Sequence, residues 1–135
     1  MAAVIESAPA SKKLTWTGRV LSGITVVFLL FDGIIKLMLI QPVVDSFTQL
    51  GYPVSQAFGI GVLDIVCAVL YAIPRTAMLG AILLTGLLGG AIATHVRVGD
   101  PIFSHVLFGV YLGLIAWGGL YLRDARLRAM IPLRA

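Results

Sequence analysis

The stretch VLSGITVVFLLFDGIIKLMLI, residues 20–40, decides the fold of this chain. It is long enough to cross a bilayer as an α-helix, because about 20 residues span the hydrocarbon core. It also contains two ionisable residues, Asp32 and Lys36. Ionisable groups are costly at that depth, so they are rare and face a partner or a polar cavity. The stretch therefore predicts a membrane helix that carries a polar site.

The rest of the sequence is also strongly apolar. Hydrophobic residues make up 59% and charged residues 12% of the 135 residues, and the mean hydropathy is +1.02. A soluble domain of this length cannot bury so much apolar surface. Further continuous apolar runs, without the alternation of strands, cover residues 57–73, 77–95 and 105–122. We expect an all-α fold, an integral membrane bundle of four transmembrane helices.

These spans form one predicted membrane domain, residues 16–124, between two tails. We expect residues 1–15 to be a flexible N-terminal tail and residues 125–135 a basic C-terminal tail. The first apolar stretch exceeds the roughly 7–15 residues of a signal-peptide core, so it is expected to be retained as a span. Residues 43–50 are expected to form a short amphipathic helix on the membrane surface. The short loop 74–76 predicts an antiparallel hairpin.

The basic residues predict the orientation. With the N-terminus inside, eight of the ten lysines and arginines are cytoplasmic, namely Lys12, Lys13, Arg19, Arg75, Arg123, Arg126, Arg128 and Arg134. The positive-inside rule then places both termini in the cytoplasm, in a bacterial cytoplasmic membrane. The rule also accounts for the pI near 9.6 without a nucleic-acid partner. Residues 123–128 fit a basic patch on anionic lipid of the bilayer.

The same topology gathers ionisable residues in the outer half of the bilayer. All four spans contribute to this layer, which consists of Asp32, Lys36, Asp64, His95, Arg97 and His105. On the first span a 3-4-3-4 spacing makes one interior stripe, formed by Ser22, Thr25, Leu29, Asp32 and Lys36. We expect the six ionisable residues to be the ligand-binding candidates.

Two interpretations of this layer stay open. In the structural one, Asp32 and Lys36 pair at i,i+4, or Lys36 reaches the outer interface instead. Asp64 then pairs with His95 or Arg97. In the functional one, Asp32, Asp64 and His95 are the candidate catalytic residues. Two carboxylates in different surroundings can divide acid and base roles, and a histidine beside a carboxylate can shuttle a proton.

Other sites are disfavoured by the pattern. His95 and His105 lack the spacing of a metal or haem site, so no metal is expected and haem is disfavoured. Cys67 is the single cysteine and has no CxxC partner, which excludes thiol–disulfide chemistry within this chain. Glycines four apart at residues 86–90 and 109–113 suit close helix packing. They indicate either a homo-oligomer interface or packing inside one bundle.

Several local pieces occur in order along the chain: FDGIIK at 31–36, LGYP at 50–53, IGVLD at 60–64, GGAIATHVR at 89–97, GDP at 99–101 and LRD at 122–124. Together they resemble the DoxX-like family of small four-helix membrane proteins. The resemblance implies the four-span fold. It also implies a relation to membrane subunits associated with quinone-linked oxidation of sulfur compounds, and to partners in oxidative-stress membrane complexes. No catalytic residue set comes with it.

The sequence therefore leaves functions of different classes. One is an accessory membrane module that binds a lipophilic small molecule, such as a quinone, with Lys36 and His95 as donors to its carbonyls. It would serve a membrane oxidoreductase partner. The alternative is a membrane enzyme doing acid–base isomerisation or hydration on a small apolar substrate, which needs a carboxylate or histidine beside the reacting atom. A structural scaffold subunit is the third.

Overall fold

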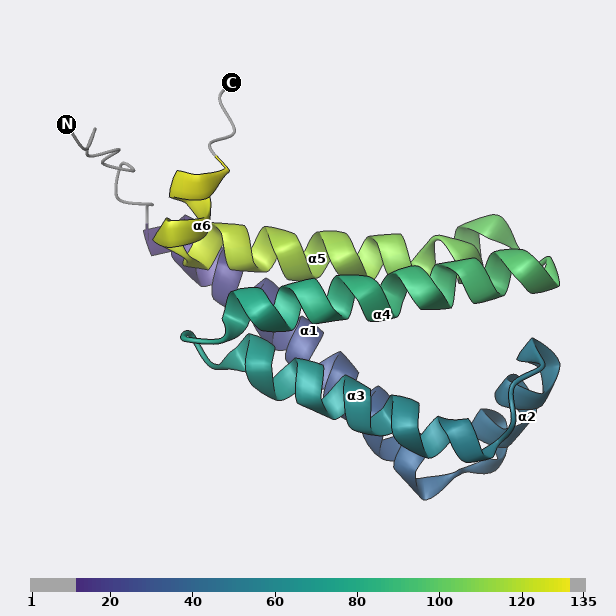
Figure 1. The fold of residues 1–135 in the computed structure, drawn as a ribbon. Coiled ribbons are helices and arrows are strands. Elements are labelled where there is room, and N and C mark those ends of the chain that lie inside the picture. Colours follow the sequence, from purple (N-terminus) through teal and green to yellow (C-terminus); the bar gives the residue numbers. More distant parts are fainter. Residues whose placement is uncertain (1–11, 132–135) are drawn as a thin grey trace.

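The computed structural model describes residues 12–131, and within them every regular element is helical. The long helices are α1 (Lys12–Met38), α3 (Ser55–Ala72), α4 (Ala77–Val98) and α5 (Phe108–Arg123) (Figure 1). The shorter elements are α2 (Gln41–Leu50), the π-helical turn η1 (Ile102–Val106) and α6 (Ala125–Met130). Four segments are long and apolar enough to cross a membrane, with η1 and α5 forming the last of them. The prediction of an all-α, four-span membrane protein is confirmed.

Three of the helices, α1, α2 and α4, end at a residue with left-handed backbone conformation. Leu39 follows α1 with φ +51°. Gly99 follows α4 with φ +75°, and the N–H groups of Gly99 and Asp100 bond the Val96 and His95 carbonyls. Glycine suits that position because it has no Cβ to clash with the backbone. α4 therefore runs three residues beyond the predicted end of its span, to Val98.

Helix α1 begins within the predicted N-terminal tail, and α6 lies within the predicted C-terminal tail. α1 begins at Lys12, so residues 12–15 are helical; the remainder of that predicted tail lies outside the described residues. Residues 125–130, which belong to the predicted basic C-terminal tail, form α6. The Asp124 side chain accepts bonds from the N–H groups of Arg126 and Leu127, which caps α6 at its first turn. The buried Leu127 packs into the bundle core.

The long helices form a ring in which α1 and α4 each pack against both α3 and α5. Glycines lie at the closest contacts. A Cβ added at Gly80 would lie 2.4 Å from the Tyr71 nitrogen. One added at Gly18 would lie 2.9 Å from the Gly119 oxygen, and one at Gly33 would lie 2.8 Å from the Gly61 oxygen. Membrane helices lack a hydrophobic drive to associate, so such close backbone contact provides the packing attraction.

The surface of the bundle is apolar and its interior contains polar side chains, as expected for a membrane protein. Large apolar side chains point outward, among them Val27, Phe31, Ile82 and Leu114. The interior near the chain ends is tightly packed around Tyr71, which is fully buried. Its hydroxyl donates to the Ala116 carbonyl at 2.6 Å and lies 3.1 Å from the Ser22 hydroxyl. Buried polar groups in hydrocarbon need such partners.

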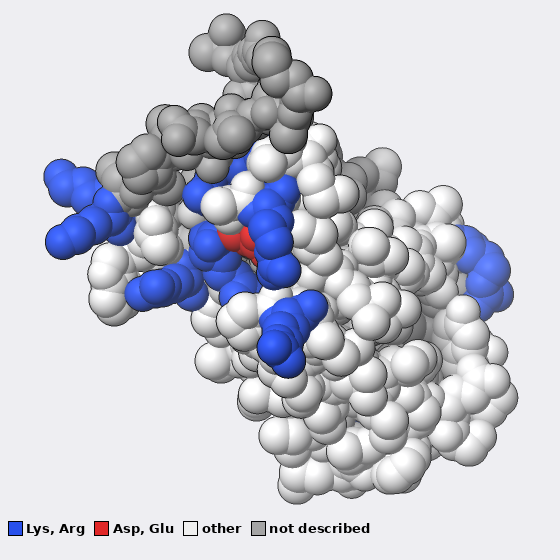
Figure 2. Space-filling view, turned by 60° about the vertical axis from the view of Figure 1, so that its left-hand side comes forward, with Lys and Arg blue, Asp and Glu red and all other residues white. Residues whose placement is uncertain are grey.

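Basic side chains gather at the end of the bundle that carries α6, hereafter the basic end (Figure 2). The described chain places Lys12, Lys13, Arg19, Arg75, Arg123, Arg126 and Arg128 there. Lys36 and Arg97 lie in the opposite half, where α1 and α4 end.

Candidate functional site

The glycine contact between α1 and α3 positions the charged residues. Gly33 and Gly61 meet backbone to backbone, and a Cβ on Gly61 would lie 2.9 Å from the Lys36 Cβ. Asp32 precedes Gly33, and Asp64 lies one helical turn after Gly61. The close approach therefore brings the polar faces of both helices together at this level.

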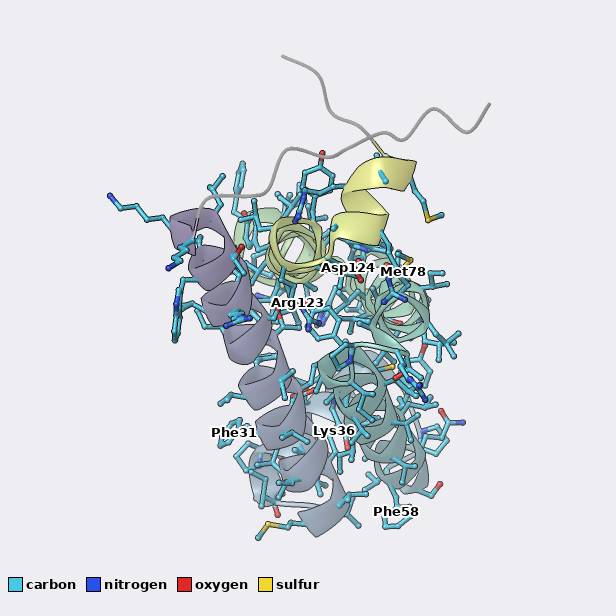
Figure 3. All side chains as sticks on the ribbon, turned by 90° about the vertical axis from the view of Figure 1, so that its left-hand side faces the viewer. Phe31, Lys36, Phe58, Met78, Arg123 and Asp124 are labelled. Carbon is cyan, nitrogen blue, oxygen red and sulfur yellow. The ribbon has the colours of Figure 1, made fainter. Side chains whose placement is uncertain are left out.

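Lys36 bridges two carboxylates. Its Nζ lies 2.5 Å from Asp32 Oδ2 on the same helix and 2.8 Å from Asp64 Oδ2 on α3. The side chains of Asp32, Lys36 and Asp64 are 28%, 17% and 4% exposed. An ammonium carries three N–H donors, so one remains for another acceptor. Figure 3 places Lys36 between the two helices.

The predicted pairing of Asp64 with His95 or Arg97 is wrong. Asp64 lies on the face of α3 that contacts α1, where its carboxylate accepts a hydrogen bond from Lys36. The expected Asp32–Lys36 pair forms, but as half of a three-residue network rather than as a pair within one helix.

His95 has a different partner, which sequence reasoning missed. Its Nδ1 lies 2.5 Å from Asp100 Oδ2. Asp100 is not among the predicted site residues, yet the left-handed Gly99 folds the chain back so that Asp100 faces the last turn of α4. The His105 ring lies edge-on to the His95 ring, with 5.7 Å between their centroids. The Ser104 hydroxyl lies 2.8 Å from His105 Nδ1.

Arg97 serves a structural contact instead of the site. Its Nη2 donates to the Leu50 carbonyl at the end of α2. Nearby, the Tyr52 hydroxyl lies 2.9 Å from Thr94 Oγ1. These two contacts join the segment around α2 to α4.

A cavity of about 490 Å³ lies between the helices in this half. Five of the six predicted residues line it, namely Asp32, Lys36, Asp64, His95 and His105. Arg97 does not line it. The walls that sequence reasoning missed are apolar or small and include Phe28, Phe47, Tyr52, Gly86, Gly90, Thr94 and Phe108. The rings of Phe28 and Phe108 lie 5.3 Å apart. An apolar cavity with a few convergent polar groups is typical of a small-molecule site.

The glycine motifs divide between packing and this cavity. A Cβ added at Gly109 would lie 2.8 Å from the Ile92 side chain, so Gly109 packs against α4 within the bundle. A Cβ at Gly86 or Gly90 would meet nothing within 4 Å, and both line the cavity. The glycines of α4 therefore leave space for a ligand.

The described residues hold no group of three His, Cys, Asp or Glu side chains able to bind a metal ion. Cys67 is buried and reduced.

The family comparison covers this whole arrangement. A family model for the DoxX-like family matches residues 20–119, which include the charged network, the His95–Asp100 pair and the cavity walls. Comparisons with curated proteins and with solved structures gave no match.

Proposed function

We propose that this chain, which belongs to the DoxX-like family, binds a lipophilic small molecule in the cavity between its four membrane helices. One observation carries the proposal. The Asp32–Lys36–Asp64 network and His95, whose ring contacts Asp100, line the same 490 Å³ cavity, whose other walls are largely apolar. A cavity of about 300–1,000 Å³ is the usual size for a small ligand.

A quinone fits this lining. A quinone has a flat apolar ring and two carbonyl oxygens, which accept hydrogen bonds. Lys36 keeps one N–H donor beyond its two carboxylates, and His95 keeps a second ring nitrogen beyond its contact with Asp100. Phe28 and Phe108 supply aromatic surface for the ring. In this role the protein is an accessory module that presents the quinone to a membrane oxidoreductase.

The charge distribution supports an orientation. Basic residues gather at one end of the bundle (Figure 2), whereas the cavity-lining Lys36 and His95 lie in the other half. Basic loops face the cytoplasm. Both termini then lie inside, in a bacterial cytoplasmic membrane, and the cavity occupies the outer half of the bilayer.

The His95–Asp100 contact favours a second candidate, a membrane enzyme. A histidine oriented by a carboxylate is a suitable general base, provided that its other nitrogen reaches the substrate. Its Nδ1 is 2.5 Å from Asp100 Oδ2, and the His95 side chain lines the cavity. Acid–base isomerisation of a small apolar substrate, abolished in His95→Gln, would identify this function.

Ligand extraction tests the binding proposal. The protein is purified in a mild detergent and extracted with organic solvent, and the extract is analysed by mass spectrometry and ultraviolet absorbance. We expect the extract to contain a lipophile in constant ratio to protein. If the ligand is the proposed one, this lipophile is a quinone. Asp32→Asn should lower this ratio because it changes the cavity wall while leaving Asp64 to hold Lys36.

Asp45→Asn is the matched control. Asp45 is an exposed carboxylate on α2 that accepts a hydrogen bond from Gln41, and it does not line the cavity. It should retain the wild-type ligand ratio. A wild-type preparation without bound lipophile, together with normal behaviour of Asp32→Asn and Asp64→Asn in cells, would reject both the binding and the enzyme functions and leave a scaffold.

A further inference from the structure

The basic end carries an excess of positive charge that the cavity does not use. Seven described basic residues lie there (Figure 2). Asp124 is the single acidic residue that the described chain places at this end, and it is turned inward. Its Oδ1 lies 2.9 Å from the Arg126 backbone nitrogen, and the side chain is 11% exposed. The exposed surface of this end is therefore almost purely positive.

Two of these arginines are occupied by the bundle itself. Arg123 donates to the Tyr71 carbonyl at 2.6 Å, and its guanidinium lies over the Tyr71 ring. Arg128 donates to the carbonyls of Tyr121 and Leu122 at the end of α5. Both side chains hold α3, α5 and α6 together. They are therefore not the best candidates for an external anion.

Arg75 and Arg126 are both exposed, and Arg126 is bonded to the turn that carries Arg75. Arg126 Nη2 donates to the carbonyl of Pro74 at 3.0 Å, which brings its guanidinium to the α3–α4 turn beside Arg75. Both residues are exposed, and the Arg126 side chain is 66% exposed. Asp124 Oδ2 forms an ion pair with Arg126 Nη2 at 3.5 Å, but one carboxylate offsets only one of the two positive charges. Paired guanidinium groups suit phosphate oxygens, because each offers several N–H donors in a plane.

The flank of this end has the features of a membrane interface. Trp16 on α1 is 63% exposed, and the Arg19 guanidinium lies 5.9 Å from its ring centroid. Exposed tryptophans of membrane proteins concentrate at the level of the lipid headgroups. Met130 and Ile131, at the end of α6, are also exposed. The basic end therefore lies where lipid phosphates are present.

We propose that Arg75 and Arg126 bind the phosphate of an anionic phospholipid in the leaflet around the basic end. The phosphate lies between the two guanidinium groups, at the joint of the α3–α4 turn with α6. The bound lipid thereby links α6 to the membrane surface. This inference is independent of the cavity and of its ligand.

Lipid retention in native mass spectrometry tests the site. The full-length protein in detergent is incubated with phosphatidylglycerol or phosphatidylcholine, and the bound lipids are counted. Wild type should retain phosphatidylglycerol preferentially. Arg75→Gln with Arg126→Gln should reduce that preference about five-fold per removed charge, as expected for a basic residue at an anionic membrane surface. Replacing both residues with lysine should keep only part of the preference, because an ammonium keeps the charge but lacks the planar set of donors.

Arg97→Gln is the control, since it removes one positive charge from the opposite half. If the double variant does not fold, Arg75→Gln alone keeps the test valid, because no side-chain bond to Arg75 occurs among residues 12–131. Equal retention of the two lipids by wild type would overturn the site, as would an unchanged preference in the glutamine variants. Displacement of the lipid by an equal concentration of inorganic phosphate would also overturn it, by identifying a free-anion site.

Discussion

The two halves of this bundle use polar side chains in opposite ways. Near the basic end, the Tyr71 hydroxyl is enclosed between helices and donates to the Ala116 carbonyl at 2.6 Å. In the other half Lys36 is bonded as closely, to Asp32 and Asp64, yet it lines a cavity of about 490 Å³. Hydrogen bonding alone therefore does not separate a structural polar group from a site. What distinguishes the two is the presence of a cavity beside the polar group.

Replacing Lys36 gives the largest expected loss of stability. Lys36→Met leaves the carboxylates of Asp32 and Asp64 together without a cation. Removing one partner of a buried ionic network costs about 3–5 kcal/mol, so we expect unfolding free energy to fall by that order. Chemical or thermal unfolding in detergent measures it. Lys13→Met, at an exposed position, is the control; equal stability of the two variants would mean that the network contributes nothing.

Two glycines of α4 test the difference in packing between the two halves. Gly80→Ala places a Cβ 2.4 Å from the Tyr71 backbone nitrogen, where no rotamer change relieves the clash. We expect a loss of about 3 kcal/mol, at the upper end of overpacking effects. Gly86→Ala on the same helix meets nothing within 4 Å and should be close to neutral. Similar melting temperatures for the two variants would contradict the difference in packing between the halves.

Tyr71→Phe tests the polar packing of the basic half. It removes the hydroxyl that donates to the Ala116 carbonyl and contacts Ser22. The loss of a buried hydrogen bond should cost about 1–2 kcal/mol. Tyr111→Phe removes a hydroxyl that donates to the Phe103 carbonyl at an exposed position, and its unfolding curve should overlay that of wild type. A neutral Tyr71→Phe would mean that this hydroxyl contributes little.

The smallest effect on stability should come from Gly90→Leu. This variant tests whether the cavity half of the bundle binds a ligand. The new side chain enters the cavity, where Gly90 has no neighbour within 4 Å. Stability should change by less than about 0.5 kcal/mol, whereas the copurifying lipophile should be lost. In Gly118→Leu, whose added Cβ also meets nothing and which does not line the cavity, the lipophile should be kept. Retention in both variants would contradict ligand binding at this cavity.

The sequence predicted the positions of the helices far better than the side-chain contacts between them. Long apolar runs identify membrane spans because hydrocarbon leaves few alternatives to a helix. The partner of Asp64 depends instead on the rotation of α3 about its axis, which the contact between Gly33 and Gly61 sets. Both glycines lie within sequence pieces used for the family resemblance. Nothing in their spacing, however, shows that they face each other.

Two further features depended on local backbone geometry. Asp100 reaches His95 only because Gly99 adopts a left-handed conformation; a glycine after an apolar run is a known helix-end signal that would have suggested it. The α6 helix follows from Asp124 acting as an N-cap. The predicted basic C-terminal tail, residues 125–135, was defined by its charge alone, which does not indicate a cap at Asp124.

The contact between Lys36 and Asp64 also has a consequence for how the protein is made. α1 enters the membrane with Asp32 and Lys36 already able to pair within one helix. α3 carries Asp64 and, among the described residues, finds its ionic partner on α1 rather than on itself. Until α1 is beside it, α3 exposes an unpaired carboxylate to lipid, which is costly. The ionic partner of Asp64 therefore lies on the membrane helix that is synthesised before α3, so α3 can pair its carboxylate as soon as it packs against α1.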